Sequence, residues 1–130
     1  GVAEPTTAVV LDREPGAGQG LDGLAVLTRY DDGAVLATVP RYQAFTDYAE
    51  TLSSMGISFV EIAGNVEPLL VSVIVPDGFN PQGLSPLFTQ RVLTRPDSTR
   101  ILFTVPVAEL SKVIGRFLAA GLRLEHVYDY

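Results

Sequence analysis

The sequence predicts an α+β protein in which amphipathic helices cover one face of a β-sheet. Two segments of the chain each read as a strand, a helix and a second strand, and both helices carry apolar residues at helical spacing. The composition is typical of a folded domain, since 47% of the 130 residues are hydrophobic and 18% are charged. A chain of this length is expected to form one domain.

The N-terminal residues 1–23 are rich in Gly and Pro and hold one short apolar run, AVVL. We therefore expect them to be flexible or loosely packed, and residues 24–130 to form a single α+β domain. Residues 18–23, GQGLDG, match the G-x-G-x-x-G pattern of dinucleotide-binding loops. Such a loop must open a helix whose N-terminus receives the pyrophosphate, whereas here an alternating strand pattern follows. We interpret the match as a glycine-rich linker.

The first strand–helix–strand segment lies in residues 24–64. It opens with a hairpin in which Asp-Asp-Gly joins LAVLTRY to AVLATV. An amphipathic helix follows, with apolar residues at i, i+3, i+4 and i+7 from Phe45, and Gly56 is positioned to end it. The stretch ISFVEIAG then reads as a strand.

The second segment lies in residues 69–130 and repeats this order. LLVSVIVP and RILFTVP are strands, and the weak alternation of the first predicts burial on both of its faces. AELSKVIGRFLAAG is an amphipathic helix that ends at Gly121, and LRLEHVYDY is the last strand. Residues 77–99 are expected to form a long loop with a short helical or strand piece near residues 87–93.

The two segments read as copies of one β-α-β unit, because VLATVP and ILFTVP share their ending and their helices align. Duplicated units of this kind predict a ferredoxin-like two-layer sandwich with a mixed sheet, elaborated by an extra N-terminal hairpin strand at residues 24–30. The pseudo-repeats would be residues 24–64 and 69–130. Both helices would lie on one face, which leaves the other face for a second protomer or for the N-terminal segment.

TVPVAELSKVIGRFLAAGLRLEHVYDY resembles the opening of an ACT domain, a small amino-acid-sensing module, with the match strongest over residues 101–130. Residues 35–64 match more loosely, so the whole chain resembles a tandem ACT protein. The resemblance implies non-enzymatic ligand binding and association through sheet edges or helices. It places the ligand at the loops between strand and helix.

Those loops supply four candidate ligand-binding residues, which are Arg41, Tyr42, Val107 and Glu109. ACT domains usually carry a glycine there, where the backbone approaches the ligand. Neither loop of this chain holds one, and a Cβ restricts such an approach.

Charge and composition exclude several kinds of site. The net charge of −6 argues against nucleic acid, and the absence of cysteine excludes disulfides and zinc–thiolate sites. No apolar run approaches the length of a membrane helix, so no membrane insertion is expected. We interpret His126 as a packed strand residue, because alternation places Glu125 and Asp129 on the opposite face. We therefore expect no metal, no cofactor, no catalytic residues and no enzymatic activity.

Two functions remain. In the first, the domain is a regulatory module that senses a small polar metabolite, with an amino acid among the alternatives, and forms a homodimer. In the second, it is a protein–protein interaction domain, with an extracytoplasmic location among the alternatives, that docks a partner through the open sheet face and the loop at residues 77–99. We expect a cytoplasmic location, or a periplasmic one if a signal upstream has been removed.

Overall fold

The computed structural model describes residues 5–16 and 20–128. Its strands and helices follow one another in an order that is nearly the same in the two halves of the chain. In sequence order the elements are β1 (Thr6–Leu11), β2 (Ala25–Arg29), β3 (Val35–Pro40), α1 (Gln43–Ser54), β4 (Phe59–Ile62), β5 (Leu69–Pro76), β6 (Phe88–Arg91), β7 (Ser98–Val105), the 3-10 turn η1 (Val107–Glu109), α2 (Leu110–Ala119) and β8 (Leu124–Val127).

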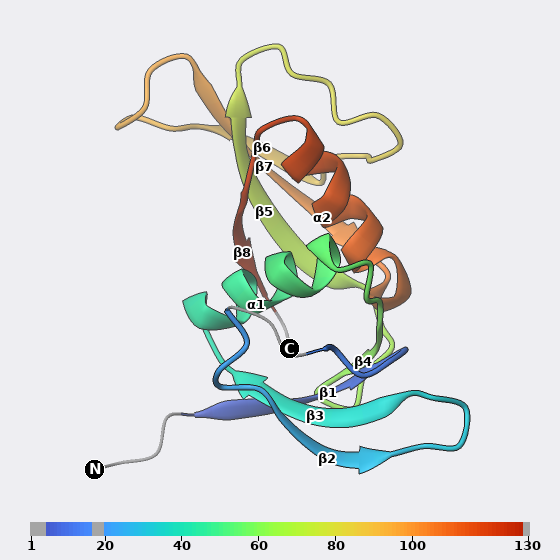
Figure 1. The fold of residues 1–130 in the computed structure, drawn as a ribbon. Coiled ribbons are helices and arrows are strands. Elements are labelled where there is room, and N and C mark those ends of the chain that lie inside the picture. The colour runs from blue at the N-terminus through green and yellow to red at the C-terminus, as the bar shows by residue number, and fades with distance from the viewer. Residues whose placement is uncertain (1–4, 17–19, 129–130) are drawn as a thin grey trace.

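The strands form two four-stranded sheets (Figure 1). Sheet A has the order β2-β3-β1-β4 and sheet B has the order β6-β7-β5-β8, and every paired strand is antiparallel to its neighbour. The predicted α+β class is confirmed, but the prediction of one mixed sheet is wrong. In each half, the strands on either side of the helix do not pair with each other. A further strand, β1 or β5, lies between them and is antiparallel to both.

Strand β1 corrects the expectation that residues 1–23 are flexible or loosely packed. It lies between β3 and β4 in sheet A, and its Val9 and Leu11 side chains are 1% and 0% exposed. Its short apolar run is stabilised by two strands that come much later in the sequence, so local pattern alone could not reveal it. Residues 1–4 and 17–19 lie outside the described residues.

The glycine-rich stretch runs into strand β2, as expected for a linker, although Gly18 and Gln19 lie outside the described residues. The backbone N–H of Gly23 donates a 2.6 Å hydrogen bond to the Tyr48 hydroxyl on α1. A Cβ at position 23 would stand 2.7 Å from that oxygen. Gly23 therefore allows close packing of this turn against α1.

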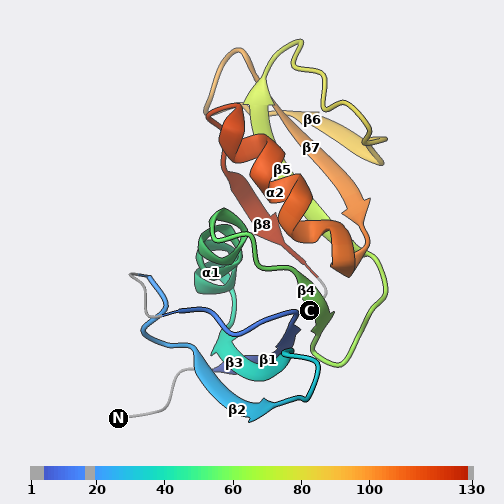
Figure 2. The same ribbon diagram turned by 45° about the vertical axis from the view of Figure 1, so that its right-hand side comes forward.

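Both predicted helices are confirmed. Gly56 and Gly121 follow α1 and α2 with positive φ angles of 75° and 77°, which suit glycine just after a helix end. Figures 1 and 2 show α1 between sheet A and strand β8, and α2 along one face of sheet B. One hydrophobic core runs through both halves and includes Phe45, Leu52 and Phe103.

Strand β8 departs from simple alternation. Its register with β5 shifts between Ser72 and Val73, and both Leu124 and Val127 are buried although they are three positions apart. This bulge breaks the period of two, so Glu125 and His126 are both half-exposed. Asp129 and Tyr130 lie outside the described residues.

The prediction that β5 is buried on both faces is confirmed only in part. One face is fully buried, whereas on the other Ser72 is 0% exposed but Leu70 and Ile74 are half-exposed. The short element near residues 87–93 is a strand, β6, at the edge of sheet B. The long segment between β5 and β7 therefore divides into a loop at residues 77–87, an edge strand and a turn.

Replacing Leu52 by Ala should destabilise the protein by about 2–5 kcal/mol, because the side chain is 0% exposed in the shared core. Leu118→Ala should cost about 2 kcal/mol or less, since Leu118 is only partly buried against the core. Urea unfolding of the two variants tests this order. A larger effect for Leu118→Ala would contradict the packing of α1.

Candidate functional site

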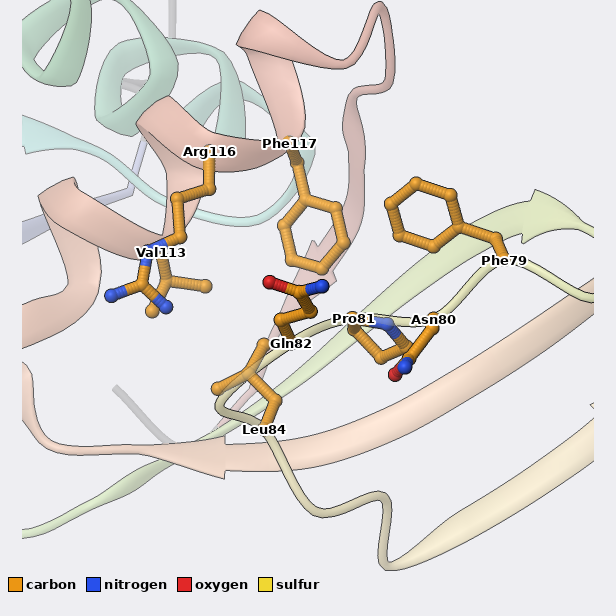
Figure 3. Close-up of a pocket in the computed structure, with 8 residues that line it drawn as sticks. All are labelled: Phe79, Asn80, Pro81, Gln82, Leu84, Val113, Arg116 and Phe117. Atoms are coloured by element: carbon orange, nitrogen blue, oxygen red, sulfur yellow. The ribbon is translucent and has the colours of Figure 1, made fainter.

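A pocket of about 220 Å³ lies between the loop that follows β5 and helix α2 (Figure 3). One wall comes from the loop and the other comes from the helix, so two distant parts of the sequence form it. Its lining residues are Phe79, Asn80, Pro81, Gln82, Leu84, Val113, Arg116 and Phe117.

Local turns shape the loop side of the pocket. The N–H of Phe79 donates to the Pro76 carbonyl at 3.0 Å, and the N–H of Leu84 donates to the Pro81 carbonyl at 3.1 Å. Gly83 adopts a positive φ of 79°, which a residue with a Cβ rarely does. These turns place Phe79 and Leu84 against the core, where both are partly buried.

A row of aromatic rings attaches the loop to sheet B. The ring of Phe79 lies 6.2 Å from that of Phe117 on α2, and Phe117 lies 5.8 Å from Phe103 on β7, measured between centroids. Tilted aromatic pairs at these distances attract each other beyond simple burial. The pocket therefore borders the core, with an apolar wall that does not depend on the polar loop residues.

A second pocket of about 290 Å³ adjoins the first and adds charge to the site. It shares Leu84, Val113 and Arg116 with the first pocket and also includes Gly83, Glu109 and Lys112. The α2-side residues 109, 112, 113 and 116 repeat at helical spacing, so they share one face of η1 and α2. Arg116 is the charged residue that lines both pockets.

The guanidinium of Arg116 lies close to the loop backbone. Its Nη1 atom is 3.4 Å from the place that a Cβ on Gly83 would occupy. A side chain at position 83 would touch the guanidinium at an ordinary van der Waals distance, so Arg116 lies against this turn at the junction of the two pockets. Within the described part of the chain, neither Arg116 nor Lys112 forms an ion pair.

A wider groove of about 460 Å³ lies on the face of sheet B that α2 does not cover, but its main charges are already paired. Arg100 binds both carboxylate oxygens of Glu125 at 2.8 Å and donates to the Gln90 amide oxygen at 2.8 Å. The buried Ser72 hydroxyl donates to the same carboxylate at 2.9 Å. These bonds satisfy Ser72, the one buried side chain on this face of β5.

The hydrogen bonds from Arg100 hold the pKa of Glu125 below its ordinary value, against the opposing effect of burial. His126 packs edge-on against Tyr128, with ring centroids 4.4 Å apart. The ring packs as expected, but His126 is half-exposed and lines the same groove as Glu125, so the expectation that strand alternation places these two residues on opposite faces is wrong. Among the residues that the structure describes, no cluster of three or more His, Cys, Asp or Glu could hold a metal ion.

The four residues proposed from the sequence do not converge on one site. Arg41 lies over the ring of the exposed Tyr42, at 5.3 Å, just before α1. Val107 is fully buried in η1, and Glu109 is exposed at the adjoining pocket. Their role in ligand binding stays a prediction.

Helix α1 separates the two loops. Ser111, at the start of α2, donates to the Ile57 carbonyl, which lies just beyond the C-terminus of α1. Tyr42 precedes the other end, and a helix of 12 residues is about 18 Å long. The two loops therefore lie at opposite ends of α1. The sequence did not identify the residues of the pocket between this loop and α2, because the unusual length of the loop at residues 77–99 was the only feature that pointed to a site there.

Glu125→Gln should make the stability of the protein less dependent on acid pH. Because the folded-state pKa is lowered, the carboxylate stabilises the fold above its ordinary value of 4.5, and this contribution is lost as pH falls through the lower folded value. The difference in urea midpoint between wild type and variant should shrink below about pH 4.5.

Glu14→Gln provides a matched control, since Glu14 also binds an arginine, Arg29, but the pair is exposed. Its effect should be smaller at every pH. A difference for Glu125→Gln that stays constant down to pH 2 would contradict the role of its ionised carboxylate.

No helix in the described ranges is long and apolar enough to cross a membrane. Comparison with protein-family models, curated proteins and solved structures found no match to this chain. The argument for function therefore rests on the geometry of the pocket.

Proposed function

We propose that this protein is a non-enzymatic regulatory domain that binds a small molecule between the loop at residues 77–87 and helix α2. The observation that carries the proposal is an apolar pocket whose two walls come from different elements and whose edge carries polar groups (Figure 3). The apolar residues are Phe79, Leu84, Val113 and Phe117, and the polar groups belong to Asn80, Gln82 and Arg116. Apolar walls with a few convergent polar groups are typical of ligand sites.

The size of the pocket limits its ligand. A cavity of about 150 Å³ accommodates benzene. The pocket of about 220 Å³ therefore suits a single ring or a branched alkyl group, while polar parts of the ligand extend into the adjoining pocket. A small metabolite with one apolar group fits this description, and an apolar amino acid, which the ACT resemblance implies, is among the ligands to be tested.

Chain connectivity supports a regulatory role. The loop that roofs the pocket continues directly into β6, the edge strand of sheet B, whose four residues are all exposed. A ligand that holds the loop against α2 also restrains the start of β6. Binding in the pocket would in this way alter a strand edge that can pair with another chain.

We also propose that the two halves derive from one duplicated, ACT-like unit of the ferredoxin-like kind. Both sheets have the same strand order relative to the chain, and β1 and β5 each carry a register shift against the strand that follows the helix. The repeated unit would then be β1 to β4 and β5 to β8, which adds β1 to the first segment expected from the sequence.

Benzyl alcohol, L-leucine and L-phenylalanine serve as probes of the pocket. A ligand at 100 times its Kd stabilises by about 2.7 kcal/mol, which raises Tm by several degrees for a domain of this size. We expect at least one probe to raise Tm and to shift the amide NMR signals of residues 79–84 and 113–117.

Two tryptophan variants localise the binding. Leu84→Trp should fill the pocket and abolish the response, whereas Leu93→Trp should keep it, since Leu93 is 92% exposed and outside the lining. The proposal fails if no probe changes Tm or the spectra, or if Leu84→Trp responds like wild type.

A second candidate function is protein–protein interaction through the region around β6. Leu87, Phe88 and Leu93 are 66%, 54% and 92% exposed, so three large apolar side chains gather about an edge strand. An open edge with apolar side chains is a template for another strand, and a second copy of this chain is the simplest partner.

Light scattering over a range of concentrations tests this association. We expect wild type to dimerise, and the double change Phe88→Asp with Leu93→Asp to leave a monomer, because charge blocks edge pairing. Leu27→Asp, at an equally exposed position on β2, is the control and should still dimerise. A wild-type protein that is monomeric throughout would contradict self-association.

A further inference from the structure

Two cations lie on one face of α2, and one of them, Arg116, lines the apolar pocket. Lys112 and Arg116 are one helical turn apart, both are exposed, and both line the adjoining pocket. Within the described ranges no acidic side chain forms an ion pair with either of them. The chain as a whole carries a net charge of −6, so two free cations at one pocket are a local exception.

Helix stability does not account for both charges. Glu109 is the N-cap residue of α2, without a side-chain capping hydrogen bond, and Arg116 lies in the last turn; both positions are favourable for the helix dipole. Lys112 lies in the first turn, where a cation is unfavourable, and it is one helical turn from both Arg116 and Glu109, so repulsion from the arginine offsets attraction to the glutamate. The helix therefore gains little stability from Lys112.

The shape of the site places an anion between the two pockets. Arg116 lines both of them, and its guanidinium lies against the loop beside Gly83. Figure 3 shows Arg116 on the same side of the cavity as Val113, with the ring of Phe117 further along the helix. An anionic group at Arg116 would have apolar surface within reach on its pocket side and Lys112 on its other side.

The remaining acid does not oppose this arrangement. Glu109 is seven positions before Arg116, which is about 10 Å along a helix axis. It lines the adjoining pocket only. Glu109 is three positions from Lys112, so the anion is expected nearer to Arg116 than to Lys112.

We infer that the ligand of this pocket is an apolar carboxylate, whose ring or branched alkyl group occupies the cavity and whose carboxylate is bound by Arg116 and Lys112. A planar guanidinium matches a carboxylate with two parallel hydrogen bonds, and the lysine adds a second positive charge. The inference rests on the proposed function, because it names the ligand class of the same pocket.

Matched acid and amide probes test the inference on the full chain. Phenylacetate and phenylacetamide share a ring, and 4-methylpentanoate and 4-methylpentanamide share a branched alkyl group. In each pair only the acid is charged at pH 7. Isothermal titration should show each acid binding about 10-fold more tightly than its amide, because charge-assisted hydrogen bonds are the stronger ones. Added salt should weaken the acids alone.

Charge-neutral variants then assign the effect to residues. Arg116→Gln should reduce the affinity for phenylacetate to that for phenylacetamide, without changing the affinity for the amide. Lys112→Gln should reduce the affinity for phenylacetate by a smaller factor. Arg91→Gln removes an exposed cation on β6, away from the pocket lining, and should change neither.

The outcomes separate the two proposals. Acids and amides that bind equally well would overturn the carboxylate inference and leave the pocket as a ligand site. An Arg116→Gln variant that keeps the preference for acids would also overturn it. If no acid or amide binds to wild type, the proposed function itself fails.

Discussion

The structure depends on helix α1 being buried from two sides. Phe45, Ala49 and Leu52 are fully buried in the core that covers sheet A. On another side of the helix, the Glu50 carboxylate is only 7% exposed and binds Arg123, just before β8, at 2.7 Å. A buried carboxylate without its partner would be costly, so this pair holds the two halves in one relative position. The hydrogen bonds to Glu50 also raise the pKa of the Arg123 guanidinium.

The pocket follows from where this shared core ends. Helix α2 lies along one face of sheet B, and the loop at residues 77–87 lies beside this helix (Figure 2). Phe79 packs on Phe117 at the edge of the core, and the turn at Gly83 shapes the loop. A pocket remains between the helix and the loop. Binding residues are often found on loops that a folded scaffold positions.

Two charged side chains of sheet B pair with each other, whereas two cations on α2 form no ion pair within the described residues. Arg100 and Glu125 satisfy each other above the buried Ser72, so their charges stabilise the sheet rather than attract a ligand. Lys112 and Arg116 share a pocket with Glu109, but within the described residues neither cation forms an ion pair. The same residue types therefore have different roles, and the arrangement around them decides which.

The sequence by itself determined the elements with strong local signals. Periodicity and turn chemistry predict both helices and their glycine ends, the β2–β3 hairpin and the unusual length of the loop at residues 77–99. These features depend on interactions between residues that are close in the sequence, so the local pattern of residue types is enough to predict them.

Only the tertiary structure decided what depends on distant partners. Strand β1 became a central strand because β3 and β4 pair with it on either side, and a bulge against β5 turned Val127 inward. The candidate site moved for the same reason, since Arg41 and Glu109 lie at opposite ends of α1 while Phe79 and Arg116 meet across a pocket. Strand order, bulges and pockets arise from contacts between residues that are far apart in the chain. Because the periodicity of a segment reflects only its own residues, it cannot predict these contacts.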